Sequence, residues 1–278
     1  MSKSIWIKLF ATAGLLFILS GCSFNPLADP KTLIQTPELP SDKQTLSSII
    51  SAELPEGASL QSPRNGNGSK IQTVDLNGDG ISETIVFYQT TTGRINGLIF
   101  EKSGDGWVRK STIDSGGFTL ESVEITDITN DGHRDIVVGY SNDTTNSETS
   151  SKRLVIYSYD KDKVVQVDDM PYSYYSIVDM DGDGINDLVI SKINNSGYVN
   201  ISAYRYKNGF QLMSSMDLLN TIGSDHFYNV VAGKVTPSQN GIIMDQTLGV
   251  SGFSHLIVME DGKLEDVFPL SQQATYKD

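Results

Sequence analysis

Three short acidic segments have the clearest chemistry in the sequence. They read DLNGDGISE at 75–83, DITNDGHRD at 127–135 and DMDGDGIND at 179–187, and are called loops 1, 2 and 3 below. Each carries oxygen-bearing side chains at positions 1, 3, 5 and 9 and a glycine at position 6. A hard cation such as Ca²⁺ needs oxygen ligands of this kind around a sharp turn. The spacing therefore predicts up to three structural calcium sites.

The predicted ligands follow from position. In loop 1 they are Asp75, Asn77, Asp79 and Glu83; in loop 2, Asp127, Thr129, Asp131 and Asp135; in loop 3, Asp179, Asp181, Asp183 and Asp187. The backbone carbonyl of position 7 is expected to add one oxygen in each loop, from Ile81, His133 and Ile185.

These loops have two alternative interpretations, an EF-hand and a metal-free turn. An EF-hand places a bidentate Glu at position 12 between two helices, whereas position 12 here is Val86, Val138 or Ile190 within an apolar run. A turn rich in Asp and Gly needs no metal, and this alternative is strongest for loop 2, where Thr129 is a weak neutral ligand beside Arg134. A fourth segment, 233–241, has lost every acidic position, and we expect no metal there.

The loops recur at intervals of 52 residues, which indicates a repeated structural unit. Each is followed by an apolar run typical of a strand, then by two more strand-like runs separated by turn signals, with a further strand leading into the next loop. The sequence thus predicts an all-β fold, a β-propeller-like array of about four four-stranded blades. The strand at 70–74 is expected to complete the last blade and close the ring, with an open or truncated array as the alternative.

The loop pattern followed by a hydrophobic strand resembles the FG-GAP/VCBS repeats of integrin-α-like β-propellers, over about residues 68–260. The resemblance implies that calcium binds between neighbouring strands of a blade. The Phe-Gly and Gly-Ala-Pro elements that name the family are not recognisable before these loops.

The first residues have the pattern of an export signal. Lys3 and Lys8 precede an apolar run, 9–19, that is too short to span a bilayer. Cys22, which follows Leu-Ser-Gly, is the chain's one cysteine. The segment resembles a bacterial lipoprotein signal, which implies lipidation of Cys22 and attachment to the outer face of a membrane; a general secretion signal before an unpaired thiol is the alternative. The predicted organisation is a signal at 1–21, a tether at 22–40, a short helix at 41–56 and the repeats at 57–278.

Composition narrows the function. With 21 Lys and Arg against 34 Asp and Glu, the net charge of −13 argues against nucleic acid as a partner. One cysteine excludes an internal disulfide, and the three histidines, His133, His226 and His255, form no catalytic motif. Tyr172, Tyr174 and Tyr175 fit either a binding face or strand interiors, and the polar stretch 142–151 either recognition or a simple connection.

These observations favour a lipid-anchored, non-catalytic calcium-binding propeller at the cell envelope that contacts a protein or glycan. The alternative is an envelope hydrolase or lyase on a propeller scaffold, with its site in an axial pocket.

Overall fold

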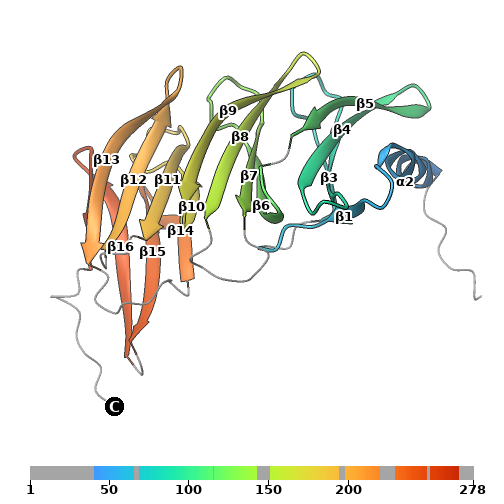
Figure 1. The fold of residues 1–278 in the computed structure, drawn as a ribbon. Coiled ribbons are helices and arrows are strands. Elements are labelled where there is room, and N and C mark those ends of the chain that lie inside the picture. Colours follow the sequence, from blue (N-terminus) through green and yellow to red (C-terminus); the bar gives the residue numbers. More distant parts are fainter. Residues whose placement is uncertain are drawn as a thin grey trace, which may run out of the picture. The chain divides into compact units, whose positions relative to one another are not determined.

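The computed structural model describes residues 41–65, 69–114, 116–142, 151–193, 198–219, 229–248 and 251–268. Those from Leu46 onward belong to one compact unit. The described residues form helix α2 (Ser41–Glu53) and four antiparallel sheets (Figure 1). The short helix and the all-β character were both expected from the sequence.

The strands group into sheets in chain order. Sheet 1 contains β1 (Ser59–Gln61), β2 (Ile71–Val74), β3 (Glu83–Gln89), β4 (Ile95–Ser103) and β5 (Gly106–Ile113). Sheet 2 contains β6 (Thr119–Thr126), β7 (Asp135–Ser141), β8 (Lys152–Asp160) and β9 (Lys163–Tyr172). Sheet 3 contains β10 (Tyr174–Val178), β11 (Asp187–Ile193), β12 (Tyr198–Tyr206) and β13 (Phe210–Leu219). Sheet 4 contains β14 (Asn229–Thr236), β15 (Gln239–Leu248), β16 (Ser251–Glu260) and β17 (Lys263–Asp266).

The pairing corrects the expected division of the repeat. The strand before each loop was assigned to the preceding blade, but it pairs with the strand that follows the loop, as β6 does with β7 and β10 with β11. Each loop is therefore a hairpin connection inside one sheet. The expected closure of a ring by residues 70–74 was wrong, because β2 pairs with β3 from Ile71↔Val86 to Val74↔Glu83.

Sheet 4 was expected to lack its last strand, and the corrected division completes it. Its first strand, β14, runs antiparallel to β15 and joins it through the tight turn at Pro237 and Ser238. This turn occupies the place that a nine-residue acidic loop occupies in sheets 1 to 3. The segment 233–241 thus retains the hairpin without the loop.

Consecutive sheets pack face to face through shared apolar clusters. One cluster joins sheets 1 and 2 (including Ile99 and Tyr140), another joins sheets 2 and 3 (including Val137 and Ile190), and a third joins sheets 3 and 4. Strands buried on both faces need apolar residues at successive positions rather than alternate ones. This requirement explains the unbroken apolar runs that follow the loops.

Helix α2 covers the remaining face of sheet 1. Its buried residues Leu46 and Ile50 lie in a cluster with Val86, Leu98 and Phe100 of that sheet. The spacing of four residues places both side chains on one side of the helix. The helix therefore gives the first sheet the apolar cover that the other sheets obtain from a neighbour.

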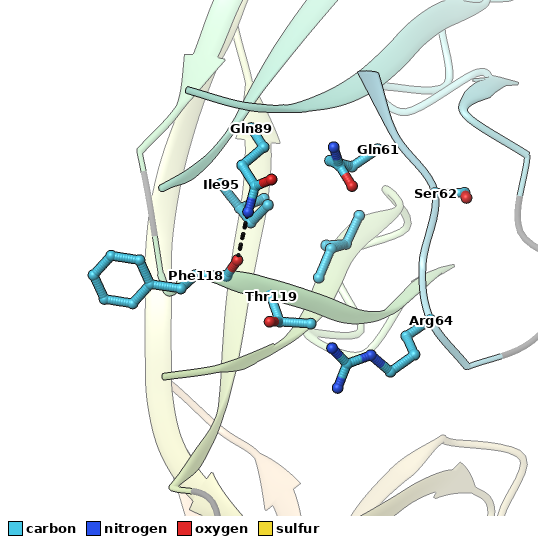
Figure 2. Close-up of a pocket in the computed structure, with 8 residues that line it drawn as sticks. Gln61, Ser62, Arg64, Gln89, Ile95, Phe118 and Thr119 are labelled. Carbon is cyan, nitrogen blue, oxygen red and sulfur yellow. Dashed lines mark hydrogen bonds between the residues drawn. The ribbon is translucent and has the colours of Figure 1, made fainter. Parts of the chain in front are cut away.

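A short segment after β1 crosses from sheet 1 to sheet 2. The backbone N–H of Arg64 donates to the carbonyl of Leu120, and that of Asn65 donates to the carbonyl of Glu121. The crossing borders an open pocket of about 290 Å³, called the cavity below. Figure 2 shows its lining: Gln61, Ser62 and Arg64 from the crossing segment, with Gln89, Ile95, Phe118, Thr119 and Leu120 from the two sheets.

Several sequence predictions lie outside the described residues. They are the signal at 1–21, the lipidated Cys22 with the tether to residue 40, His226, and residues 143–150 of the polar stretch. Within the part of the chain that the structure describes, no helix combines the length and apolarity needed to cross a membrane.

Candidate functional site: three acidic hairpin loops

Each acidic loop joins two paired strands of one sheet, β2 to β3, β6 to β7 or β10 to β11. Its glycine at position 6 allows the turn. Gly80, Gly132 and Gly184 have φ values of 86°, 88° and 88°. This left-handed region is costly for a residue with a Cβ atom. The sequence prediction that these glycines are needed for backbone geometry is thereby confirmed.

The position-1 carboxylates organise the backbone of the loops. In loop 1, Asp75 accepts hydrogen bonds from the N–H groups of Gly78 and Gly80, at 2.7 and 2.9 Å. In loop 3, Asp179 accepts from Gly182, Asp183 and Gly184. Asp127 plays the same part in loop 2. Since a carboxylate offers about four lone-pair sites, these bonds leave capacity for a cation.

The position-5 carboxylates bind the next part of each loop. Asp79, Asp131 and Asp183 accept the N–H groups of Ile81, His133 and Ile185 at 2.7, 2.8 and 2.9 Å. In the described structure, the residues at position 7 thus form hydrogen bonds through their backbone N–H groups. The role of their carbonyls as metal ligands stays a prediction.

The position-9 carboxylates are the buried members of the loops. Glu83, Asp135 and Asp187 are each 0% exposed. Each accepts the backbone N–H of position 2, from Leu76, Ile128 and Met180, at 2.8 to 3.0 Å. Desolvation raises the pKa of all three, against the opposing effect of these hydrogen bonds. Position 9 therefore ties the strand after the loop to the strand before it.

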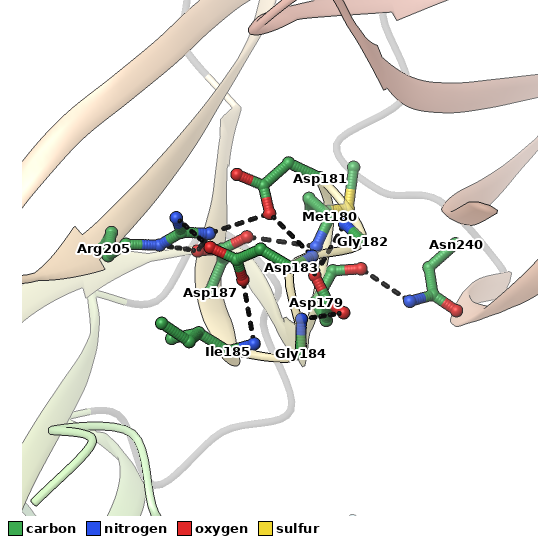
Figure 3. Close-up of polar contacts among 10 residues, drawn as sticks. All are labelled: Asp179, Met180, Asp181, Gly182, Asp183, Gly184, Ile185, Asp187, Arg205 and Asn240. Carbon is green, nitrogen blue, oxygen red and sulfur yellow. Dashed lines mark hydrogen bonds and ion pairs between the residues drawn. The ribbon is translucent and has the colours of Figure 1, made fainter. Parts of the chain in front are cut away.

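Loop 3 holds a cation of its own, the guanidinium of Arg205 on β12 (Figure 3). Arg205 lies 2.7 Å from Asp183, 3.0 Å from Asp181 and 2.8 Å from Asp187. Burial alone raises the pKa of Asp181, but the hydrogen bond and charge of Arg205 outweigh it and lower the pKa. Arg205 thus compensates three of the four carboxylates that were predicted to hold a metal.

Loop 2 satisfies its buried carboxylate with hydroxyl groups. Thr129 donates from its hydroxyl and its N–H to Asp135, at 3.3 and 2.8 Å, and Ser158 adds a side-chain hydrogen bond. Thr129, predicted as a weak metal ligand, therefore binds Asp135 directly.

Loop 1 leaves its buried carboxylate incomplete. One oxygen of Glu83 accepts the Leu76 N–H, whereas the other, Oε1, is buried without a hydrogen-bond partner among the described residues. Leaving a buried acceptor unsatisfied costs about 1–3 kcal/mol. The residue directly opposite on β4 is Glu101, a second carboxylate. Loop 1 therefore lacks positive charge at the place where loop 3 has Arg205.

These arrangements fit a divalent cation in different ways. Asp179, Asp181 and Asp187 have ligand oxygens within 4.8 Å of one another and could hold a metal ion. In loop 1 the orphaned Oε1 of Glu83 and the oxygen-only donor set suit a hard cation such as Ca²⁺.

Sequence reasoning missed the residues opposite position 9. Glu101 pairs directly with Glu83. Ser158 and Arg205 lie one residue beyond the paired positions Tyr157 and Tyr204, and hydrogen-bond Asp135 and Asp187. They come from the next strand, beyond a turn of variable length. Only the strand register could have identified them.

A further set of contacts ties each hairpin to the preceding one, always from position 8. The N–H of Arg134 donates to the carbonyl of Leu76, at 2.8 Å. The amide of Asn186 donates to the hydroxyl of Thr126, at 3.3 Å. The amide of Asn240 donates to the carbonyl of Asp179, at 2.6 Å (Figure 3). The fourth hairpin thus retains the tie although it has lost the acidic loop.

The remaining candidate residues from the sequence, three tyrosines and His255, pack within or between the sheets. Tyr172 and Tyr175 pack edge to face at 5.4 Å between sheets 2 and 3, and Tyr174 packs between sheets 3 and 4. Of the two alternatives for these tyrosines, strand interiors are correct. His255 is buried on β16, with Nδ1 2.7 Å from Asp266.

The cavity between sheets 1 and 2 has a charged pair at its edge. Arg64 lines the cavity and contacts Glu121 at 3.2 Å, and Asn65 donates to the same carboxylate. Glu121 is 3% exposed and sits at a shift of register between Leu120 and Ser122, a β-bulge. Bulges commonly redirect a side chain out of the regular alternation. In Figure 2 the ring of Phe118 points away from the cavity, to which this residue presents its backbone.

Comparisons with known proteins concern the fold. No family model matches the chain, and neither does any curated protein. Among solved structures it resembles the exotype rhamnogalacturonan lyase YesX, with a TM-score of 0.40 and 11% identity over 72% of this chain. It also resembles the Bacillus licheniformis rhamnogalacturonan lyase PL11, with a TM-score of 0.45 and 13% identity over 76% of this chain. The chain spans 42% of the length of each lyase. A Xanthomonas type IV secretion system related protein matches with a TM-score of 0.29 and 14% identity, over 76% of this chain and 99% of that protein.

These comparisons correct one expectation. The sequence favoured a non-catalytic protein that acts through binding alone, and the solved structures that resemble the chain, which include two lyases, do not support that assignment. We therefore do not retain it.

Proposed function

We propose that this is a calcium-binding protein of propeller-like architecture, in which up to three Ca²⁺ ions held by the hairpin loops fix the strand before each loop to the strand after it. The observation that carries the proposal is the buried, unpartnered Oε1 of Glu83. It lies beside a loop whose other carboxylates, Asp75 and Asp79, already hold the backbone in a turn. A cation there satisfies the orphaned oxygen and offsets the repulsion among the carboxylates.

Calcium-dependent stability tests this proposal. We expect a Ca²⁺ concentration ten times the dissociation constant to stabilise the full-length chain by about 1.4 kcal/mol per site, since metal binds the folded state. Asp75→Asn should weaken the response, and Asp105→Asn, at an exposed turn outside the loops, is the matched control. Identical thermal unfolding in Ca²⁺ and in chelator would refute the proposal.

The proposal includes the type of repeat and the attachment of the protein to a membrane. The 52-residue period and the position of the loops support assignment to the FG-GAP/VCBS type of repeat. The signal-like segment supports lipidation at Cys22 and anchoring to the outer face of the cytoplasmic membrane, or to an outer-membrane leaflet. Cys22→Ser should then release the protein from the membrane fraction. Mass spectrometry should find acyl chains on Cys22 of the native protein.

A second candidate function is cleavage of an acidic polysaccharide, which the cavity lined by Arg64, the ion-pair partner of Glu121, favours. The guanidinium of Arg64 could bind a uronic acid carboxylate and stabilise the enolate formed next to it. The Glu121 carboxylate could accept the proton from the adjacent carbon, after which the bond to the leaving sugar breaks and its oxygen takes up a proton.

An elimination assay tests this candidate. With polygalacturonate as the probe, we expect ultraviolet absorbance from the unsaturated sugar that elimination produces. Arg64→Gln and Glu121→Gln should abolish it, whereas Arg109→Gln, which removes a surface pair with Glu53, should not. Unchanged activity in both cavity variants would exclude this site.

A further inference from the structure

The residue opposite position 9 differs in charge among the three otherwise similar loops. In sheet 1, Glu83 pairs with Glu101; in sheet 2, Asp135 accepts a hydrogen bond from Ser158; in sheet 3, Asp187 accepts one from Arg205. Residues directly opposite in an antiparallel pair have Cβ atoms about 4.5–5.5 Å apart, on the same side of the sheet. This one position thus presents a carboxylate, a hydroxyl or a guanidinium to the buried end of the loop.

The guanidinium of Arg205 serves loop 3 as a fixed cation. Its side chain is 12% exposed, and it contacts three carboxylates at 2.7 to 3.0 Å. Both oxygens of the buried Asp187 are satisfied, one by Arg205 and the other by the N–H of Met180. A divalent ion entering this cluster has to displace the guanidinium or repel it.

Loop 1 has the opposite arrangement. Glu101, whose side chain is 12% exposed, adds a carboxylate beside Glu83, and like charges placed opposite one another destabilise a strand pair. The described ion pairs of the nearby Lys110 are with Glu101 and Asp162, each at 3.0 Å, rather than with a loop residue. The unpartnered oxygen of Glu83 therefore lies at the loop whose cross-strand residue adds a carboxylate instead of a compensating group.

We propose that Glu101 is an additional acidic member of a high-affinity metal site at loop 1, and that Arg205 replaces the metal at loop 3. The cross-strand residue thereby sets the calcium affinity of each loop, a ranking called the grading below. Loop 1 depends on calcium, loop 2 binds it weakly, and loop 3 is independent of it. This inference rests on the proposed calcium-binding function and specifies which loop performs it.

A single tryptophan allows loop 1 to be observed separately. The chain has two tryptophans, Trp6 and Trp107, so Trp6→Phe leaves Trp107 alone. Trp107 is adjacent to Val108, which pairs with Glu101 on the neighbouring strand. Two strand spacings place it roughly 10 Å from the Glu83 backbone, whereas sheet 2 separates it from loop 3. Luminescence of Tb³⁺, a calcium substitute, excited through tryptophan should therefore report on loop 1.

The experiment combines this signal with calorimetric counting of Ca²⁺ on the full-length Trp6→Phe chain in detergent. Glu101→Gln should lower the affinity seen through Trp107 by about ten-fold, because ligand charge sets calcium affinity. Arg205→Gln should add one Ca²⁺ to the stoichiometry and leave the Trp107 signal unchanged. Glu265→Gln and Arg153→Gln, outside the loops, are the matched controls.

Glu101→Arg supplies an independent variant in case Arg205→Gln fails to fold. It transfers the arrangement of loop 3 to loop 1, so we expect it to abolish the Trp107-sensitised signal. Calcium uptake by the parent chain that neither Glu101→Gln, Glu101→Arg nor Arg205→Gln alters would overturn the grading alone. Absence of any calcium uptake by the parent chain would overturn the proposed function, and the grading with it.

Discussion

The side-chain amide of Asn240 donates a 2.6 Å hydrogen bond to the backbone carbonyl of Asp179, from a hairpin without an acidic loop to one that has such a loop. The tie repeats the position-8 contacts made by Arg134 and Asn186 in the preceding hairpins. Position 8 thus joins neighbouring sheets, whereas position 9 joins neighbouring strands. The two roles are separable, because sheet 4 has only the first.

Removing this tie should weaken the association of sheets 3 and 4. Asn240→Ala deletes a half-buried hydrogen bond, and we expect a loss of about 1 kcal/mol in the free energy of unfolding, measured with urea. Asn229→Ala, which removes an exposed bond to Asp245 within sheet 4, is the control. Equal effects of the two substitutions would contradict a special role for position 8.

The turn in loop 3 should depend on backbone conformation alone. Gly184 has φ +88°, and a Cβ atom there would meet nothing within 4 Å, so Gly184→Ala introduces strain without a clash. We expect a loss of about 1–2 kcal/mol in unfolding free energy. Gly233→Ala, equally open but outside the left-handed region, should be neutral. A neutral Gly184→Ala would show that the loop relaxes to another conformation.

The cover that α2 gives to sheet 1 should contribute measurably to stability. Ile50 is 1% exposed among residues of sheet 1, and Ile50→Ala should cost about 2–5 kcal/mol through lost burial and the cavity left behind. Ser47→Ala, at an exposed position of the same helix, separates this effect from helix propensity. If both substitutions shift the denaturant midpoint equally, the helix contributes no specific packing.

Stability without calcium should depend on pH through Glu83. Desolvation raises its pKa above 4.5, so above that pH the folded state holds a proton more tightly than the unfolded state does. The free energy of unfolding therefore falls as the pH rises from about 4.5 through the folded-state pKa. Glu83→Gln should remove this contribution. Because Ca²⁺ binds the ionised carboxylate, stabilisation of the parent chain by calcium should grow over the same range, and a Glu83→Gln profile parallel to the parent profile would disprove the assignment.

Local features of the repeat were predictable, and its pairing was not. Gly80 and its counterparts are required by the turn, and the apolar runs after the loops are required by burial on two faces. Whether Ile71 pairs with the strand after its loop or with a distant blade depends on tertiary contacts that periodicity does not encode. The same holds for Arg205, whose place beside Asp187 follows from the register of β11 and β12.

The backward direction of the position-8 ties bears on how the chain assembles. Arg134, Asn186 and Asn240 each bond to a residue made earlier in synthesis, 58 to 61 positions before them. Since chains emerge with the N-terminus first, every new hairpin meets a finished docking surface as soon as its own turn forms. Folding can thus proceed one sheet at a time, starting from sheet 1, whose outer face helix α2 already covers.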